Sequence, residues 1–258
     1  MGRFWSLLFL SVPVLGTLTF LLAPLYDNWL PKDISRHGYM IDHLFMFILV
    51  LTGIVFIGTE VALFWFAWRY DAKKNKEPVK YSHGSHSLEV VWTIIPTATL
   101  LFIAIYQMNV WADAKMRRPD MPPTVEVTAR QFEWRLRYPG TDGVLGTEDD
   151  LRLVNDLHVP ANEDVLVVLK SMDVLHSFFL PNLRIKQDAV PGMKQGVWFR
   201  AKEEGEYDLV CAELCGWGHY KMKGRLTVES RVQYNQWLAE QYKKQQTTQE
   251  PSATEETE

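Results

Sequence analysis

The stretch Cys211-Ala-Glu-Leu-Cys215-Gly-Trp-Gly-His219-Tyr-Lys-Met222 decides how this chain is interpreted. It places two cysteines, a histidine and a methionine within twelve residues, and His176 lies 35 residues before Cys211. Thiolate, imidazole and thioether groups are ligands that copper prefers, whereas hard metals prefer oxygen. A mononuclear blue-copper site needs one thiolate. Two thiolates separated by three residues can both bridge a pair of copper ions, so the pattern indicates a binuclear copper site.

The two cysteines have one alternative use. They are the only cysteines among the 258 residues, and in a domain outside the cytoplasm two cysteines ordinarily suggest a disulfide. A disulfide would explain neither His219 and Met222, which follow Cys215 by four and seven residues, nor the distant His176. We therefore favour metal ligands.

This run resembles the binuclear CuA loop of cytochrome c oxidase subunit II. Two other segments resemble the same family. Asp173-Val-Leu-His176-Ser-Phe, followed by residues 181–192, is similar to its first-ligand segment, and Glu89-Val-Val-Trp92-Thr-Ile-Ile-Pro96 is similar to its second transmembrane helix. The resemblance extends over roughly residues 40–240.

The resemblance implies a role for each side chain of the copper loop. Cys211 and Cys215 would bridge the two copper ions, and metal coordination itself would deprotonate both thiols. His176 and His219 would each bind one copper ion through a neutral ring nitrogen. Met222 would be a weak axial ligand, of the kind that tunes the reduction potential.

Glu213 is given two roles by the same resemblance. Its backbone carbonyl would be a weak ligand to the second copper ion. Its carboxylate would bind a magnesium or manganese ion shared with subunit I, because carboxylate oxygen suits such ions. One carboxylate cannot hold the ion alone, and a solvated side chain is the alternative.

Long apolar stretches in the first 110 residues predict membrane helices. Residues 41–68 and 88–110 are each long enough to cross a bilayer and carry aromatic residues at their edges. Five basic residues lie between them, from Arg69 to Lys80, which predicts a cytoplasmic loop. We therefore expect a transmembrane hairpin over residues 28–111, with everything after Trp111 outside the cytoplasmic membrane.

The N-terminal segment, residues 1–27, has two interpretations. Arg3 followed by a long apolar run could be a secretory signal peptide. The run is longer than a usual signal core, and Pro24 after Ala23 leaves no clean cleavage site, so we favour an uncleaved third transmembrane helix. Both interpretations place residues 26–40 outside.

Short alternating segments predict an all-β domain over residues 112–230. The expected strands are residues 124–130, 133–138, 157–159, 165–171, 196–201, 206–211 and 224–229. A cupredoxin-like Greek-key sandwich suits the spacing of the ligands, because one ligand comes from a strand end and the others from one loop. Residues 231–258 should form a polar helix to about residue 244 and then a disordered acidic tail.

Glu89 lies near the predicted cytoplasmic end of a membrane helix, where a carboxylate is costly unless it is paired or hydrated. The resemblance implies that it lies at the mouth of a proton channel into the catalytic subunit; an interfacial anchor is the alternative. Glu60 is a second carboxylate within a predicted span, and we assign it no role. The acidic stretch 141–150 lacks the spacing of an EF-hand, so a solvated loop is favoured over a cation site.

Gln131-Phe132-Glu133-Trp134 resembles the family's aromatic patch, at which electrons enter. Many members carry tryptophan where this chain has Phe132, so the chain departs from the family's pattern at this position. A place in the core of the β-domain is the alternative for Trp134.

The resemblance implies the electron-accepting subunit of a haem–copper terminal oxidase. Cytochrome c would reduce the copper pair, and the electron would pass to haem in subunit I, where oxygen is reduced to water and protons are pumped. Residues 119–230 carry 18 acidic and 13 basic residues, a net charge of −5 that favours a basic carrier. We expect no nucleic-acid partner. The chain has no Cys-x-x-Cys-His motif, so it should carry no covalent haem of its own.

Two other functions compete with this interpretation. A quinol oxidase subunit II would share the hairpin and the sandwich, but a copper-free protein has no use for five side-chain ligands. A membrane-tethered copper carrier would need open, exchangeable ligands, whereas these are expected to lie at the ends of strands. Glu89 and Trp92 also make more sense against partner helices than on a lone tether.

Overall fold

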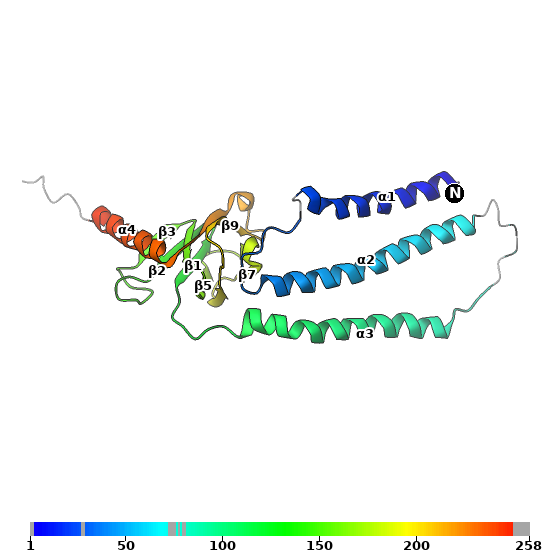
Figure 1. Cartoon of the computed structure of the whole chain (residues 1–258), viewed down its shortest axis with the longest axis horizontal. Coiled ribbons are helices and arrows are strands. Elements are labelled where there is room, and N and C mark those ends of the chain that lie inside the picture. Colours follow the sequence, from blue (N-terminus) through cyan, green and yellow to red (C-terminus); the bar gives the residue numbers. More distant parts are fainter. Residues whose placement is uncertain (1–2, 27–28, 72–75, 77, 79–80, 250–258) are drawn as a thin grey trace, which may run out of the picture. The chain divides into compact units, whose positions relative to one another are not determined.

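A computed structural model describes residues 3–26, 29–71, 76, 78 and 81–249. The chain forms two compact units. Met1–Leu30 and Asp42–Met108 form the first, and Pro31–Ile41 and Asn109–Glu258 form the second. The three long helices supply most of the first unit, and the strands all lie in the second (Figure 1).

Three described helices are long and apolar enough to cross a membrane: α1 (Arg3–Leu22), α2 (Gly38–Arg69) and α3 (His86–Trp111). Their most apolar windows have mean hydropathies of 2.0, 2.3 and 2.0, and the side chains there are not buried within the chain. Apolar surface on this scale requires lipid or partner helices. The predicted hairpin is confirmed, and α1 adds a third span, as favoured for residues 4–25. Lys73, Lys74 and Lys80 of the predicted cytoplasmic loop lie outside the described residues.

The second unit is a sandwich of two five-stranded sheets, with strand orders β3-β2-β1-β5-β8 and β4-β10-β9-β6-β7. β1 runs parallel to β5, and β10 runs parallel to β4; the other pairs are antiparallel. The cupredoxin-like sandwich is therefore confirmed. The strands are β1 (Val125–Arg130), β2 (Glu133–Tyr138), β3 (Leu151–Val154), β4 (Asp156–Pro160), β5 (Val165–Ser171), β6 (His176–Leu180), β7 (Ile185–Ala189), β8 (Gln195–Phe199), β9 (Gly205–Cys211) and β10 (Lys223–Glu229).

Three of these strands, β3, β6 and β7, were not predicted. β6 has three buried residues in succession instead of the alternation that marks a half-buried strand. β7, Ile-Lys-Gln-Asp-Ala, is polar at its centre, and β3 has only four residues. Pairing within the sheets fixes all three strands.

Residues before α2 belong to the sandwich and not to the hairpin. Ile34 is 1% exposed. The backbone N–H of Ile34 donates to the Asn182 carbonyl, and the Lys202 N–H donates to the Ile34 carbonyl. The Asp33 carboxylate lies against Gly38, where an added Cβ would be 1.8 Å from an oxygen, so a negative charge lies at the start of α2. The outer unit thus includes residues 31–41, ahead of the boundary predicted at residue 112.

The C-terminal helix, α4 (Arg231–Gln249), is longer than predicted. The ring of Trp237 stacks on that of His158, with centroids 3.9 Å apart and an interplanar angle of 8°. Further along, the Gln245 side chain accepts a hydrogen bond from the Arg152 N–H and donates one to the Asp150 carbonyl. The prediction of disorder from residue 245 is therefore wrong for residues 245–249, which continue the helix, and Gln245 ties this end of it to the sandwich. Residues 250–258 lie outside the described part of the chain.

The acidic stretch 141–150 forms a loop that two of its own carboxylates hold together. Asp150 is fully buried; its carboxylate accepts the N–H groups of Gly140 and Gly146 and lies 3.6 Å from Arg137 Nε. Asp149 accepts hydrogen bonds from the backbone and hydroxyl of Thr141. These two carboxylates close the loop, whose other residues are mostly exposed, so the loop is solvated as predicted except at the buried Asp150.

Tyr138 provides a test of the sandwich core. Its hydroxyl is fully buried, accepts the His158 N–H at 2.8 Å and donates to the His158 carbonyl at 3.0 Å. Tyr138→Phe leaves both backbone groups unpaired, so we expect a loss of about 1–3 kcal/mol in the free energy of unfolding, measured by chemical denaturation. Tyr220→Phe, at an exposed tyrosine, is the control and should change stability by less than about 0.5 kcal/mol. Equal stability of the two variants would contradict this role.

Candidate metal centre

Strand pairing brings the distant histidine to the cysteine loop. β6 lies next to β9, and Phe178 is paired with Cys211. Since His176 is two residues before Phe178, it lies at the same end of the sheet as Cys211. The Ala212 N–H donates to the Ser177 carbonyl, which extends this contact into the loop. The Cys211 N–H donates to the Met222 carbonyl at 3.2 Å and closes the base of the loop.

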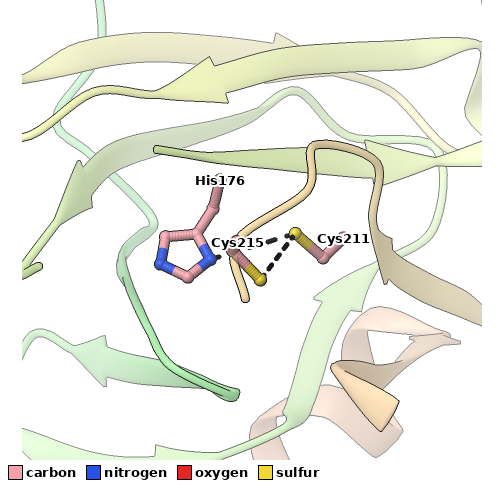
Figure 2. Close-up of side chains that lie close together, drawn as sticks. All are labelled: His176, Cys211 and Cys215. Carbon is pink, nitrogen blue, oxygen red and sulfur yellow. Dashed lines mark hydrogen bonds between the residues drawn. The ribbon is translucent and has the colours of Figure 1, made fainter. Parts of the chain in front are cut away.

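The five predicted side-chain ligands form one cluster. Cys211 Sγ lies 3.9 Å from Cys215 Sγ and 3.9 Å from His176 Nδ1 (Figure 2). Cys215 Sγ lies 3.6 Å from His219 Nδ1 and 3.8 Å from Met222 Sδ. The structure therefore brings together the side chains that the sequence singled out.

These separations fit metal ligation. Two sulfurs bound to one ion at about 2.3 Å with a tetrahedral angle lie about 3.8 Å apart, and a sulfur and an imidazole nitrogen lie about 3.5 Å apart. A disulfide would require a sulfur separation of about 2.05 Å. The two cysteines are free in the structure, so the disulfide interpretation has no support.

The ligand atoms surround both sulfurs. The Glu213 carbonyl oxygen lies 3.3 Å from Cys211 Sγ, as expected for the sixth predicted ligand atom. Cys211 thus has the His176 imidazole and the Glu213 carbonyl beside it. Cys215 has the His219 imidazole and the Met222 thioether beside it. A set of two sulfurs and four other donors exceeds what a single tetrahedral ion uses. The arrangement is suited to two ions that share the sulfurs.

The two thiols differ in acidity. Burial raises the pKa of Cys211, but hydrogen bonds with His176 and with the backbone of Glu213 outweigh burial and lower it to about 6. Burial and the neighbouring Cys211 charge raise the pKa of Cys215 to about 11. At neutral pH the pair therefore holds one proton, which metal binding must release.

Asp173 orients the first histidine, a role that the sequence analysis missed. Its carboxylate lies 2.8 Å from His176 Nε2 and also accepts the Gln131 N–H at 2.8 Å. A proton on Nε2 leaves Nδ1 free to bind a metal, and a carboxylate behind a metal-binding imidazole is a common arrangement. The signal in the sequence was an acidic residue three positions before the isolated histidine.

The aromatic patch differs from its prediction. Trp134 is fully buried, because it lies on the inner face of β2, and its ring contacts those of His176 and Phe178 with centroids 6.4 and 5.6 Å away. A docking role would require Trp134 to lie on the surface, and it does not. In the ligand loop, Trp217 is 81% exposed and meets the Phe132 ring edge-on, with ring centroids 5.4 Å apart.

Two glycines make room for this aromatic pair. An added Cβ at Gly218 would lie 2.5 Å from the Phe132 ring, and one at Gly216 would lie 3.2 Å from it. Gly216 also has a φ of +135°, which favours glycine. The close approach of Phe132 therefore fixes the path of the ligand loop and raises Trp217 to the surface.

The remaining predicted residues lie outside the cluster. Glu89 is in the first turn of α3, exposed, with an oxygen 3.7 Å from His86 Nδ1. Glu60 lies within α2. The Glu213 side chain is half-buried. A proton channel and a magnesium or manganese site shared with subunit I both involve other chains, so these roles stay predictions.

Comparisons with known proteins identify the family of this chain. The family model described as "Cytochrome C oxidase subunit II, periplasmic domain" matches residues 125–230, and the one described as "Cytochrome C oxidase subunit II, transmembrane domain" matches residues 30–110. An alternative cytochrome c oxidase subunit 2 of Bradyrhizobium diazoefficiens is 31% identical over 245 residues, covering 85% of this chain and 87% of the relative. Cytochrome c oxidase subunit 2 of Cereibacter sphaeroides is 32% identical over 222 residues, covering 74% of this chain and 73% of the relative. The crystal structure of the periplasmic domain of subunit II of cytochrome oxidase of Bradyrhizobium japonicum superimposes with a TM-score of 0.44 at 28% identity, covering 49% of this chain and 97% of that one.

Asp173→Asn tests the orienting role of the carboxylate. The amide cannot hold the Nε2 proton as a charged acceptor does, so copper affinity should fall about 10–100-fold without a change in protein stability of comparable size. The measurement is a titration against a competing copper chelator. Asp208→Asn, at an exposed position on β9, is the matched control. An unchanged affinity for Asp173→Asn would show that the imidazole needs no such partner.

Proposed function

The chain belongs to the cytochrome c oxidase subunit II family, and on that premise we propose that it is the electron-accepting subunit of a haem–copper terminal oxidase. The observation that carries the proposal is the cluster of soft donor atoms, each 3.6–3.9 Å from a cysteine sulfur. We assign it as the binuclear copper site CuA. Its side-chain ligands are His176, Cys211, Cys215, His219 and Met222.

Bound copper supplies one-electron redox chemistry at this site. The chain contributes a rigid and dry ligand set: His176 is fully buried, and Met222 and Cys215 are 1% and 4% exposed. The ligands are held by strand pairing and by Asp173, so they need to move little when the charge of the site changes. Small reorganisation favours rapid electron transfer through the site in both directions.

The aromatic pair next to the loop provides a surface for an electron donor. Trp217 is exposed and lies two residues after the ligand Cys215. Phe132, in the turn between β1 and β2, packs against its ring. An exposed aromatic residue supported by packed neighbours is typical of a binding hot spot. The net charge of −5 over residues 119–230 supports a basic donor, and cytochrome c is the proposed one.

The proposal also covers the membrane arrangement and the partners. The three apolar helices anchor the chain in a membrane, and the C-terminal domain lies outside. We propose the cytoplasmic membrane, with the sandwich on the periplasmic side. The electron acceptor would be haem in subunit I, where oxygen reduction and proton pumping take place, so this chain would be active only within the complex.

The two competing functions fit the site less well. A copper-free quinol oxidase subunit has no need for a converging set of two thiols, two imidazoles and a thioether. A copper carrier needs ligands that a partner can reach, whereas His176, Cys211, Cys215 and Met222 are buried here. Neither alternative explains the Asp173 contact behind His176.

Copper loading of the full-length chain tests the centre itself. We expect two copper ions per chain and, in the mixed-valence state, an EPR spectrum of one unpaired electron shared by two copper nuclei. Cys215→Ser removes one bridge, so the shared signal should disappear. One copper ion per unaltered chain, or an unpaired electron confined to one nucleus, would refute the binuclear assignment.

Trp217→Ala tests the donor surface in the assembled oxidase. Loss of an exposed aromatic contact should slow reduction by cytochrome c by about tenfold or more, while copper content stays the same. The measurement is stopped-flow reduction at limiting cytochrome c. Tyr81→Ala, at an exposed aromatic residue between α2 and α3, is the control and should have the unaltered rate. Equal rates for both variants would exclude Trp217 from the docking surface.

A further inference from the structure

His158 is a buried titratable side chain outside the metal centre. It lies in the middle of β4 and is 8% exposed. Its register partner on β10 is Thr227, five residues beyond the ligand Met222. The Asp156 carboxylate lies 3.3 Å from its Nε2, and the Glu229 carboxylate lies 3.1 Å from its Nδ1. Each ring nitrogen of this histidine therefore faces a negative charge.

Only a protonated ring satisfies both carboxylates. A neutral imidazole carries one N–H, so its other nitrogen is an acceptor and would face an oxygen that is also an acceptor. The imidazolium carries an N–H on both nitrogens and can donate to Asp156 and to Glu229 at once. Hydrogen bonds in which both groups are charged are about twice as strong as neutral ones. The arrangement therefore favours a positive charge on His158.

The face of the same ring is covered by the C-terminal helix α4. The Trp237 indole is stacked on it, with centroids 3.9 Å apart and the planes only 8° from parallel. Tyr138 and Tyr234 surround this indole, with ring centroids 5.5 and 5.9 Å from it. A cation over the face of a tryptophan is attracted by the ring, and more strongly when water is excluded. The charge on His158 therefore also binds the helix.

His158 is the group that changes charge near neutral pH among the described residues packed here. Burial would lower its pKa, but hydrogen bonds with Asp156 and Glu229 outweigh burial and raise the pKa above its usual value of 6.5. The hydrogen bond with His158 lowers the pKa of Asp156. Burial raises the pKa of Tyr138 well above its usual value, and it raises that of Tyr234 to about 12. Both phenols therefore stay neutral.

The neighbouring arginines keep their charge over the same range. Arg225 is the register partner of Asp156 and lies 3.1 Å from the Glu206 carboxylate. Arg231, at the start of α4, forms an ion pair with Glu163. Their charges are the same above and below neutral pH, so they cannot produce a pH dependence there.

We infer that the His158 cluster, made of His158, Asp156, Glu229 and Trp237, holds α4 against the sandwich in a proton-dependent manner. Protonated His158 donates to both carboxylates and attracts the indole. Loss of the proton leaves one carboxylate facing a bare nitrogen and removes the attraction for Trp237. Since the pKa is raised in the docked state, the stabilisation is fully present below about pH 6.5 and is lost as the pH rises through that raised pKa.

Hydrogen–deuterium exchange in the full-length chain in detergent tests this inference. Protection of residues 231–244 reports the docked helix. The buried strand β5 is an internal reference, and labelling times are scaled to the intrinsic exchange rate at each pH. From about pH 6 to about pH 9, protection of residues 231–244 relative to β5 should fall about tenfold or more, the size of one hydrogen bond to a charged group.

Two variants assign the pH dependence to the cluster. His158→Gln keeps a polar side chain but takes up no proton, so relative protection of α4 should be low and independent of pH. His83→Gln, at an exposed histidine between α2 and α3, is the matched control and should keep the pH dependence of the unaltered chain. Glu229→Gln leaves the ring and its stacking in place but removes one charged partner, so the midpoint should move to lower pH.

Three results would overturn the inference. The first is the same relative protection of α4 at both pH values in the unaltered chain. The second is a His158→Gln variant, shown by thermal melting to be folded, that keeps the pH dependence. The third is an unchanged midpoint in Glu229→Gln, which decides the matter even where His158→Gln does not fold. None of these outcomes depends on copper, so the copper proposal and this one can fail separately.

Discussion

The pairing of β6 with β9 is the contact on which the rest of the site depends. It joins two segments that are 35 residues apart and sets His176 beside Cys211. The loop between β9 and β10 then has only to return to its own base, where the Cys211 N–H meets the Met222 carbonyl. β6 and β9 are each hydrogen-bonded to a strand on both sides, and such strands change shape little. The spacing of the sulfurs is therefore fixed by backbone geometry and does not rely on the metal alone.

The groups around this sheet end each reinforce that geometry. Asp173 holds the far nitrogen of His176 and, through the Gln131 N–H, ties it to the hairpin of β1 and β2. The Gln131 side chain in turn donates to the Cys215 carbonyl. Phe132, next along the chain, fills the space left by two glycines of the loop. The same hairpin therefore supports the first histidine, the second cysteine and the exposed indole.

Much of the site could be predicted because its chemistry is local in sequence. Four of the five side-chain ligands fall within Cys211–Met222, and no packing argument is needed to group them.

The predictions that were wrong or missing have physical reasons. Alternation along β2 shows that Trp134 and Tyr138 share a face but does not say whether that face is the inner one. β6 and β7 carry weak local signals and are fixed by their neighbours, and residues 245–249 are helical because Gln245 finds partners near Asp150. Long-range contacts of this kind have no signature in a short window.

The extended segment before α2 has a practical consequence for work on the isolated domain. Ile34 fills a closed apolar site, and its backbone pairs with Asn182 and Lys202. A fragment cut after the last membrane helix would lack this strip and would leave amides and carbonyls of the sheet margin open to water. Unprotected margins of this kind recruit strands from other molecules. Solubility of such a fragment would therefore improve if residues 31–36 were grafted back through a short linker.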